Sequence, residues 1–127
     1  MLLRVFVTKW FDRWSGKEAI SDAILCDAVD EIKRGLIDAN LGGGLYKKRV
    51  ALPGKGKSGS YRTLLAYKAK ERACFVFGFS KNDRSNVNNK EEKALKALAK
   101  ELLGYNAKNI QKAVKANVLR ELRCDDE

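Results

Sequence analysis

Two basic side chains spaced two residues apart are the first indication of chemistry in this sequence. The run Leu45–Leu52 alternates like a β-strand, and Lys47 and Arg49 share one face of it. Cations that project side by side from a strand can bind one phosphate group together. We therefore expect this strand to contact a ligand that contains phosphate.

A glycine-rich loop with two more lysines follows this strand. The segment Pro53–Gly59 contains Lys55 and Lys57. It is similar to a nucleotide-binding loop, but the residues after it read as a strand, and such a loop needs a helix there. We therefore expect the loop to bind the phosphates of a nucleic-acid backbone, and we expect no nucleotide hydrolysis.

The positive charge of the chain is concentrated around these residues. The 127 residues include 26 basic and 16 acidic side chains, for a net charge of +10. The stretch 41–90 alone carries 12 basic residues against two acidic ones, Glu71 and Asp83. Positive charge concentrated in this way attracts polyanions. The candidate partners are therefore RNA, DNA or an acidic protein.

The residue types exclude several classes of enzyme. The chain has no histidine, which removes Ser-His-Asp and Cys-His nucleophiles and HExxH zinc sites. Lys, Asp, Glu or Tyr must then carry any proton transfer. The three cysteines, Cys26, Cys74 and Cys124, are far apart and odd in number, so we expect neither a disulfide nor a zinc site. With neither a signal peptide nor an apolar stretch of membrane-spanning length, we expect a cytoplasmic protein.

The pattern of apolar residues predicts one α+β domain, with N-terminal helices packed on a small antiparallel sheet and helices again at the C-terminus. Ser21 and Gly35 bound a clear helix, and Asn89 with Glu92 predicts the start of another. Strands are expected at 2–7, 45–52, 60–69 and 72–80, a helical turn at 9–14, a flexible connector at 41–44, a short helix at 106–115, and either strand or helix at 118–122.

Three aromatic residues stand close together near the N-terminus. Trp10, Phe11 and Trp14 are spaced as on one turn of a helix. This spacing favours a place in the core, and stacking on RNA bases is the alternative.

Two segments resemble a known family. Gly56–Arg62 reads GKSGSYR and Phe75–Val87 reads FVFGFSKNDRSNV, and both are similar to motifs of RelE-like and HigB-like toxins in the RelE/ParE superfamily. The resemblance implies a RelE-like microbial RNase fold for the single domain 1–127, with a core at about 3–105 and an extension at 106–127. It also implies a metal-independent mRNA endonuclease that acts on the ribosome, inhibits translation and uses no cofactor.

The resemblance also suggests roles for individual residues. Arg62 corresponds to the arginine that stabilises the transition state, and Arg84 to an arginine beyond the last core strand. Candidates for the general base are Lys57, Lys81 and Asp83. The residues expected to bind RNA are Lys47, Lys48, Arg49 and Lys55.

The sequence departs from the family pattern at two positions. Asn88 stands where RelE toxins offer a tyrosine as base, and Asn82 stands where they have a second catalytic arginine. These departures leave the general base unassigned. They also keep open two alternatives: a ParE-like toxin that inhibits gyrase, and a non-catalytic module that binds RNA or a partner.

The partner implied by the resemblance is an antitoxin. It would be a small DNA-binding protein encoded in the same operon, forming a hetero-oligomer with the toxin. An acidic helical segment of such a protein would suit the charge of residues 41–90.

Overall fold

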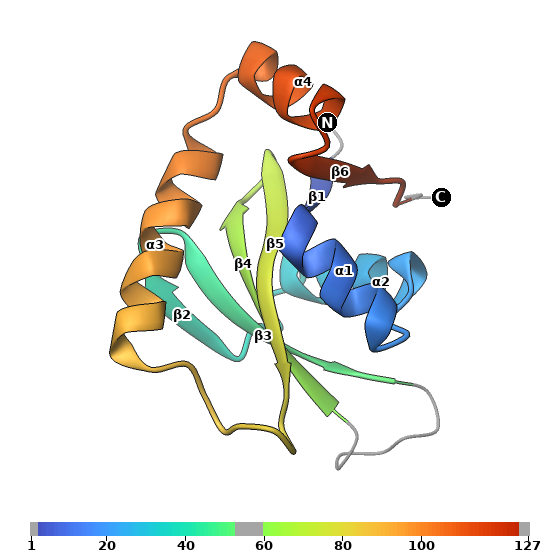
Figure 1. Ribbon diagram of the computed structural model, residues 1–127, viewed down its shortest axis with the longest axis vertical. Coiled ribbons are helices and arrows are strands. Elements are labelled where there is room, and N and C mark those ends of the chain that lie inside the picture. Colours follow the sequence, from blue (N-terminus) through green and yellow to red (C-terminus); the bar gives the residue numbers. More distant parts are fainter. Residues whose placement is uncertain (1–2, 53–59, 125–127) are drawn as a thin grey trace.

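A computed structural model describes residues 3–52 and 60–124 (Figure 1). Within these residues the chain forms an α+β domain of four helices and one six-stranded sheet, in the order β2-β3-β4-β5-β1-β6. The strands are β1 (Arg4–Thr8), β2 (Ala39–Gly42), β3 (Leu45–Ala51), β4 (Ser60–Lys68), β5 (Arg72–Ser80) and β6 (Leu119–Leu122). The helices are α1 (Lys9–Lys17), α2 (Asp22–Lys33), α3 (Asn89–Leu103) and α4 (Ala107–Lys115).

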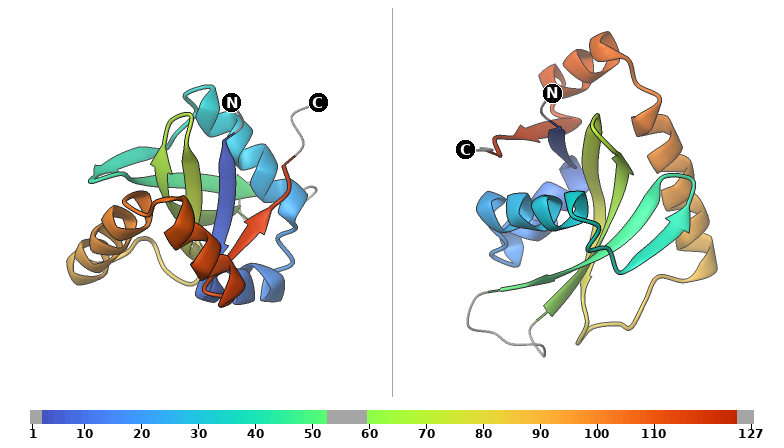
Figure 2. Two further views of the ribbon diagram at one scale, coloured as in Figure 1. Left: turned by 90° about the horizontal axis from the view of Figure 1, so that it is seen from above. Right: turned by 180° about the vertical axis from the view of Figure 1, so that it is seen from behind.

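Helices cover both faces of the sheet. Helices α1 and α2 pack on one face and α3 packs on the other (Figure 2). The first face buries Phe11 of α1 against Phe75 of β5, with ring centroids 5.1 Å apart. On the second face Leu102 of α3 packs in a cluster with Leu45 and Leu64. The central strands are therefore apolar on both sides, as the run Cys74–Phe77 predicted.

One strand pairing differs from the antiparallel sheet that the sequence predicted. Strand β1 runs parallel to β5, with Val5 opposite Ala73. The chain enters β2 in the direction opposite to β1, and the three antiparallel pairings from β2 to β5 then give β5 the direction of β1. Strand β6 then pairs antiparallel with β1, which makes residues 119–122 a strand at the sheet edge and not a helix.

Two local predictions were also wrong. The segment 41–44 is not a flexible connector, because its first residues belong to β2 and Gly42, Gly43 and Gly44 have φ angles of 91°, 64° and 86° in a tight turn to β3. Helix α3 begins one residue earlier than expected. Asn88 is the N-cap, and it forms the capping box with Glu91.

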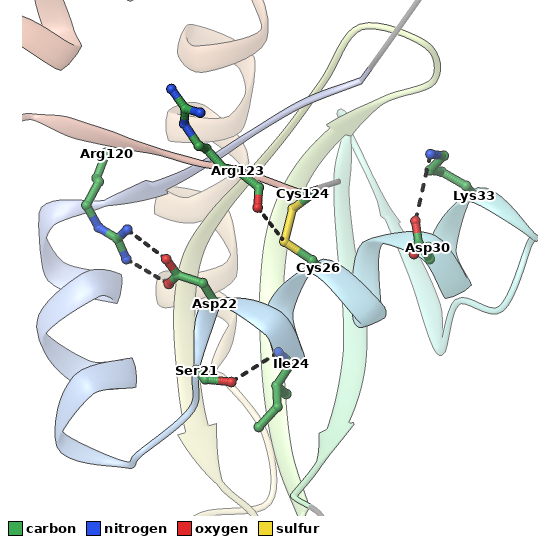
Figure 3. Close-up of a disulfide and its surroundings, with 9 residues drawn as sticks. All are labelled: Ser21, Asp22, Ile24, Cys26, Asp30, Lys33, Arg120, Arg123 and Cys124. Carbon is green, nitrogen blue, oxygen red and sulfur yellow. Dashed lines mark hydrogen bonds and ion pairs between the residues drawn. A yellow bond between two sulfur atoms is a disulfide. The ribbon is translucent and has the colours of Figure 1, made fainter. Parts of the chain in front are cut away.

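The expectation of no disulfide was also wrong. Cys26 of α2 and Cys124, just after β6, form a disulfide with their Cα atoms 5.4 Å apart (Figure 3). Their separation of 98 residues along the chain concealed the pair, because the register of β6 on β1 is what brings them together. Disulfides are rare in proteins of reducing compartments, so this pair gives no support to the cytoplasmic location expected from the sequence. In the part of the chain described, no helix is both long enough and apolar enough to cross a bilayer.

Candidate active site

Basic side chains gather on the α3-facing side of β3 and β4. Arg49 of β3 lies directly opposite Arg62 of β4 in the antiparallel register, and Lys47 is the next residue of β3 on the same face. Among the described residues, no carboxylate forms an ion pair with any of these three side chains. Their positive charge is therefore available to an anionic ligand. We call Lys47, Arg49 and Arg62 the cation cluster.

Neutral groups orient two members of this cluster. The Lys47 ammonium donates a hydrogen bond to Oδ1 of Asn86, at 3.2 Å. Arg62 donates through Nη1 to the hydroxyl of Ser60, also at 3.2 Å. Neither partner carries charge, so both contacts restrain the cation without neutralising it.

A β-bulge in β5 sets which aromatic rings lie beside the cluster. Leu65 of β4 pairs with Phe75 and Leu64 pairs with Phe77, so Val76 is an extra residue on β5. Beyond the bulge, Phe77 and Phe79 therefore point to the same face as Arg62. Phe79 is the direct cross-strand neighbour of Arg62.

Arg84 extends the site from the segment that follows β5. Its guanidinium lies over the Phe79 ring, 5.7 Å from the centroid. It forms a two-bond ion pair with Glu91, including Nη1 to Oε2 at 3.0 Å, and Nε donates to the carbonyl of Asn86 at 3.1 Å. The hydrogen bonds to Glu91 raise the pKa of Arg84, and those same bonds lower the pKa of Glu91.

Glu91 ties this arginine to the start of α3. The same carboxylate accepts a hydrogen bond from the backbone N–H of Asn88, at 2.8 Å, in the capping box. The position of Arg84 is therefore coupled to the position of the helix. Asn88, at the place of the family's tyrosine, uses its side chain as the N-cap.

Several predicted residues are not part of this arrangement. Lys48 points to the opposite face, where it is 7% exposed and forms a 2.6 Å ion pair with Glu31 of α2. Its predicted role in RNA binding therefore has no support from the geometry. Lys55 and Lys57 lie outside the described residues.

The remaining candidates for the base lie in the turn after β5. Lys81 is exposed, and its backbone N–H donates to the carbonyl of Ser60 at 3.5 Å. Asp83 lies near Tyr61: burial raises the pKa of that phenol, and the carboxylates of Glu18 and Asp83 raise it further. Tyr61 itself packs edge-on against Trp14 of α1, on the face opposite to the cation cluster.

The described residues offer no evident place for a metal. Within 3–52 and 60–124, no group of three or more His, Cys, Asp or Glu side chains could hold a metal ion. The cation cluster itself provides fixed positive charges, which suit binding of phosphate and stabilisation of negative charge.

Comparison with known proteins agrees with this geometry. A family model described as the RelE toxin of the RelE/RelB toxin–antitoxin system matches residues 3–122. The chain belongs to the RelE toxin family. The matched segment runs from β1 through β6 and so includes every helix and strand described above. No curated protein matches the chain. As a RelE-family toxin, the protein belongs to a toxin–antitoxin system and has an antitoxin as its partner.

Sequence reasoning missed three residues that contact the candidate site. Asn86 holds Lys47, Phe79 supports Arg84, and Glu91 binds Arg84. Two signals were available. Phe79 and Asn86 lie in the segment Phe75–Val87 that resembles the family motif, but the resemblance did not show which side chains they contact. A capping box was expected at Asn89 and Glu92, one residue too late to point to Glu91.

Proposed function

We propose that this RelE-family toxin is a metal-independent endoribonuclease that cuts mRNA on the ribosome and so inhibits translation. The observation that supports the proposal best is the cation cluster. Three positive side chains share one sheet face and have no carboxylate partner among the described residues. Like charges placed opposite each other destabilise a sheet, so their retention favours a role in binding an anion.

The proposed reaction is an internal transesterification. The 2′-oxygen of a ribose loses its proton to a base and attacks the adjacent phosphorus. The bond from phosphorus to the 5′-oxygen breaks, and that oxygen takes up a proton. The products are a 2′,3′-cyclic phosphate and a 5′-hydroxyl end. The transition state carries extra negative charge on the phosphate oxygens, which fixed cations stabilise.

The family resemblance and the contacts of each residue support the following roles. Arg62, whose guanidinium donates to the hydroxyl of Ser60, stabilises the transition state. Arg49 and Lys47 bind the scissile phosphate and its neighbour. Arg84, fixed over Phe79, binds the phosphate on the far side of Arg62.

The general base is one of the three candidates named from the sequence. Lys81 is exposed in the turn that follows β5, the strand that pairs with the Arg62 strand. Asp83 lies two residues further along the same turn, and its backbone N–H donates to the carbonyl of Ser80 at 3.0 Å. Lys57 remains a candidate on sequence grounds alone.

Expression of wild-type and Arg62→Ala protein in a bacterial host tests the proposal. We expect wild-type induction to stop growth and to produce new 5′-hydroxyl ends inside coding regions within minutes. The Arg62→Ala variant should produce neither, while its circular dichroism and melting temperature stay close to those of the wild type. The matched control is Arg34→Ala, which removes an arginine after α2 on the other side of the sheet and should remain toxic.

Other outcomes contradict the proposal. Growth arrest with intact mRNA and a DNA-damage response would indicate a gyrase-inhibiting toxin. RNA binding that weakens steeply with salt, without cleavage on or off ribosomes, would indicate a binding module.

The positive charge of the cation cluster also indicates how the antitoxin binds. We infer that an acidic segment of a small DNA-binding antitoxin, encoded in the same operon, covers the cation cluster in a hetero-oligomer. Its carboxylates would occupy the positions that RNA phosphates take in the active toxin.

A further inference from the structure

One of the three clustered aromatic residues is not in the core. Phe11 is fully buried and Trp14 packs against Gly78 of β5, but Trp10 is 47% exposed. A tryptophan of that exposure on α1 contributes little to the core and leaves apolar ring surface in water.

The exposed indole is connected to the candidate active site by stacked rings. Trp10 stacks on Phe77, with centroids 4.6 Å apart and ring planes 19° apart. Phe77 in turn lies 6.4 Å from Phe79, and Arg84 covers Phe79. An uninterrupted aromatic series therefore runs from Trp10 to a cation of the site.

The end of one strand explains why Trp10 can reach this position. Strand β1 pairs with β5 only as far as Val7 opposite Phe75, while β5 continues to Ser80. Helix α1 starts directly after β1, at Lys9, so its first turn lies beside the part of β5 that β1 leaves uncovered. Because the bulge at Val76 turns Phe77 toward the cation cluster, Trp10 meets that ring at the sheet edge.

We propose that Trp10 is a stacking platform for one nucleobase of the single-stranded RNA that the cation cluster holds by its phosphates; the inference rests on the proposed function. Single-stranded RNA is recognised by this combination, in which aromatic rings stack on splayed bases and cations follow the backbone. The platform lies a few nucleotides from the scissile phosphate. It increases the affinity for RNA and fixes the position of the RNA strand along the site, and it takes no part in the chemical step.

Binding of a short single-stranded RNA with 2′-O-methyl riboses, which cannot be cleaved, tests the platform. We expect Trp10→Ala to weaken binding by about 5- to 150-fold, the range for loss of one base–aromatic stack. Trp10→Phe keeps a flat ring and should stay within about 3-fold of the wild type. Leu36→Ala removes another exposed apolar side chain, one that is 52% exposed after α2, and should change nothing.

Two further measurements separate stacking from charge. A second measurement uses a series of RNAs, each lacking the base at one position. At one position, loss of the base should weaken binding to the wild type but should not weaken binding to Trp10→Ala any further. The dependence of affinity on salt should be unchanged in Trp10→Ala and shallower in Arg49→Ala, because only the arginine displaces counterions from phosphates.

The outcomes distinguish this inference from the proposed function. If the wild type and Trp10→Ala bind RNA equally well, or if no RNA position is coupled to Trp10, the stacking role of Trp10 is wrong. The proposed role of the cation cluster in binding RNA is then unaffected. If Trp10→Ala weakens only the complex with the antitoxin, the indole is a protein contact and the inference is wrong. If neither the wild type nor any variant binds or cuts RNA, the proposed function itself fails and the platform with it.

Discussion

Arg49 and Arg62 are direct cross-strand partners on β3 and β4, and among the described residues no carboxylate forms an ion pair with either of them. Opposed like charges on neighbouring strands cost stability. Four basic residues at other positions of the sheet form ion pairs with carboxylates, as Arg4 does with Glu121 at 2.8 Å, whereas Arg72 of β5 donates to backbone carbonyls. The contrast indicates that the unpaired arginines serve a ligand.

Arg49→Thr should therefore stabilise the fold while weakening the toxin. Removal of one of the opposed charges should raise the free energy of unfolding by about 0.2 to 1 kcal/mol, measured in urea at low salt. The gain should shrink at about 1 M salt, where screening suppresses repulsion. RNA cleavage by the same variant should fall. Lys68→Gln on β4 removes a lysine that is paired with Glu71 at 3.2 Å, and it should bring no gain.

Glu91→Gln should slow cleavage without loss of RNA affinity. The substitution removes the charge that orients Arg84, while a glutamine can still complete the capping box, so α3 should stay intact. Misplacement of a catalytic-site cation by about 1 Å costs up to about 100-fold in rate. We expect a fall of about 10- to 100-fold in kcat, with KM unchanged or lower because Arg84 loses its competing carboxylate.

The neighbouring glutamate is the matched control for this variant. Glu92 lies in the same turn of α3 and pairs with Lys96 at 3.2 Å, away from Arg84. Glu92→Gln should leave kcat unchanged. A comparable loss of rate in both variants would show that the effect comes from the helix and not from Arg84.

Reduction of the disulfide should destabilise the oxidised protein substantially. Cys26 and Cys124 close a loop of 98 residues, and a disulfide of this kind contributes about 2 to 4 kcal/mol. The melting temperature should fall when reductant is added. The double variant Cys26→Ser, Cys124→Ser should melt at the lower temperature with or without reductant, and a response of this variant to reductant would contradict the assignment.

The third cysteine provides an internal check on the thiol count. Burial raises the pKa of Cys74 to about 12, so its thiol is both inaccessible and protonated in the native state. Thiol reagents should therefore find no reactive group in the folded, oxidised protein and one group after unfolding without reductant.

Asp22→Asn should cost stability near neutral pH but not in acid. Arg120 of β6 donates hydrogen bonds to Asp22 of α2 (Figure 3). It also donates to Asp12 of α1, so it fixes the C-terminal strand to both helices. The hydrogen bond from Arg120 lowers the pKa of Asp22, with burial opposing it. The pair therefore stabilises fully above the ordinary pKa of 3.8 and loses its contribution as the pH falls through the lower folded-state value.

A urea titration at several pH values measures this effect. The difference between wild type and Asp22→Asn should be about 0.2 to 1 kcal/mol at about pH 7, as for a mostly exposed ion pair. It should vanish at pH values well below 3.8. A difference that persists undiminished in acid would mean that Asp22 contributes by packing or hydrogen bonding alone.

Local patterns of side chains predicted much of the fold. The alternation in β3 placed Lys47 and Arg49 on one face and Lys48 on the other, as the structure has them. Ser21 is the N-cap of α2, with its hydroxyl accepting from the N–H of Ile24 at 3.2 Å. Such features depend on residues within one turn or one strand, and a sequence displays them directly.

Contacts between distant elements could not be read in this way. The Cys26–Cys124 pair and the parallel pairing of β1 with β5 join segments far apart in the chain. The bulge at Val76 shifts the faces of β5 by one residue, so that Phe77 and Phe79 lie beside the cations. A periodic pattern shows that a strand has two faces, but the register with its neighbours decides what each face meets.

The sequence by itself therefore determined most of the helices and strands, though not β2 or β6, together with the location of the positive charge and the resemblance to RelE toxins, because each of these depends on neighbouring residues. Only the tertiary structure decided that Arg49 stands opposite Arg62, that Glu91 holds Arg84 over Phe79, and that Lys48 is buried away from the site. It also decided that Trp10 is exposed while Phe11 is buried. The physical reason is that the charge environment and burial of a side chain depend on the surfaces packed around it, and those surfaces come from distant parts of the chain.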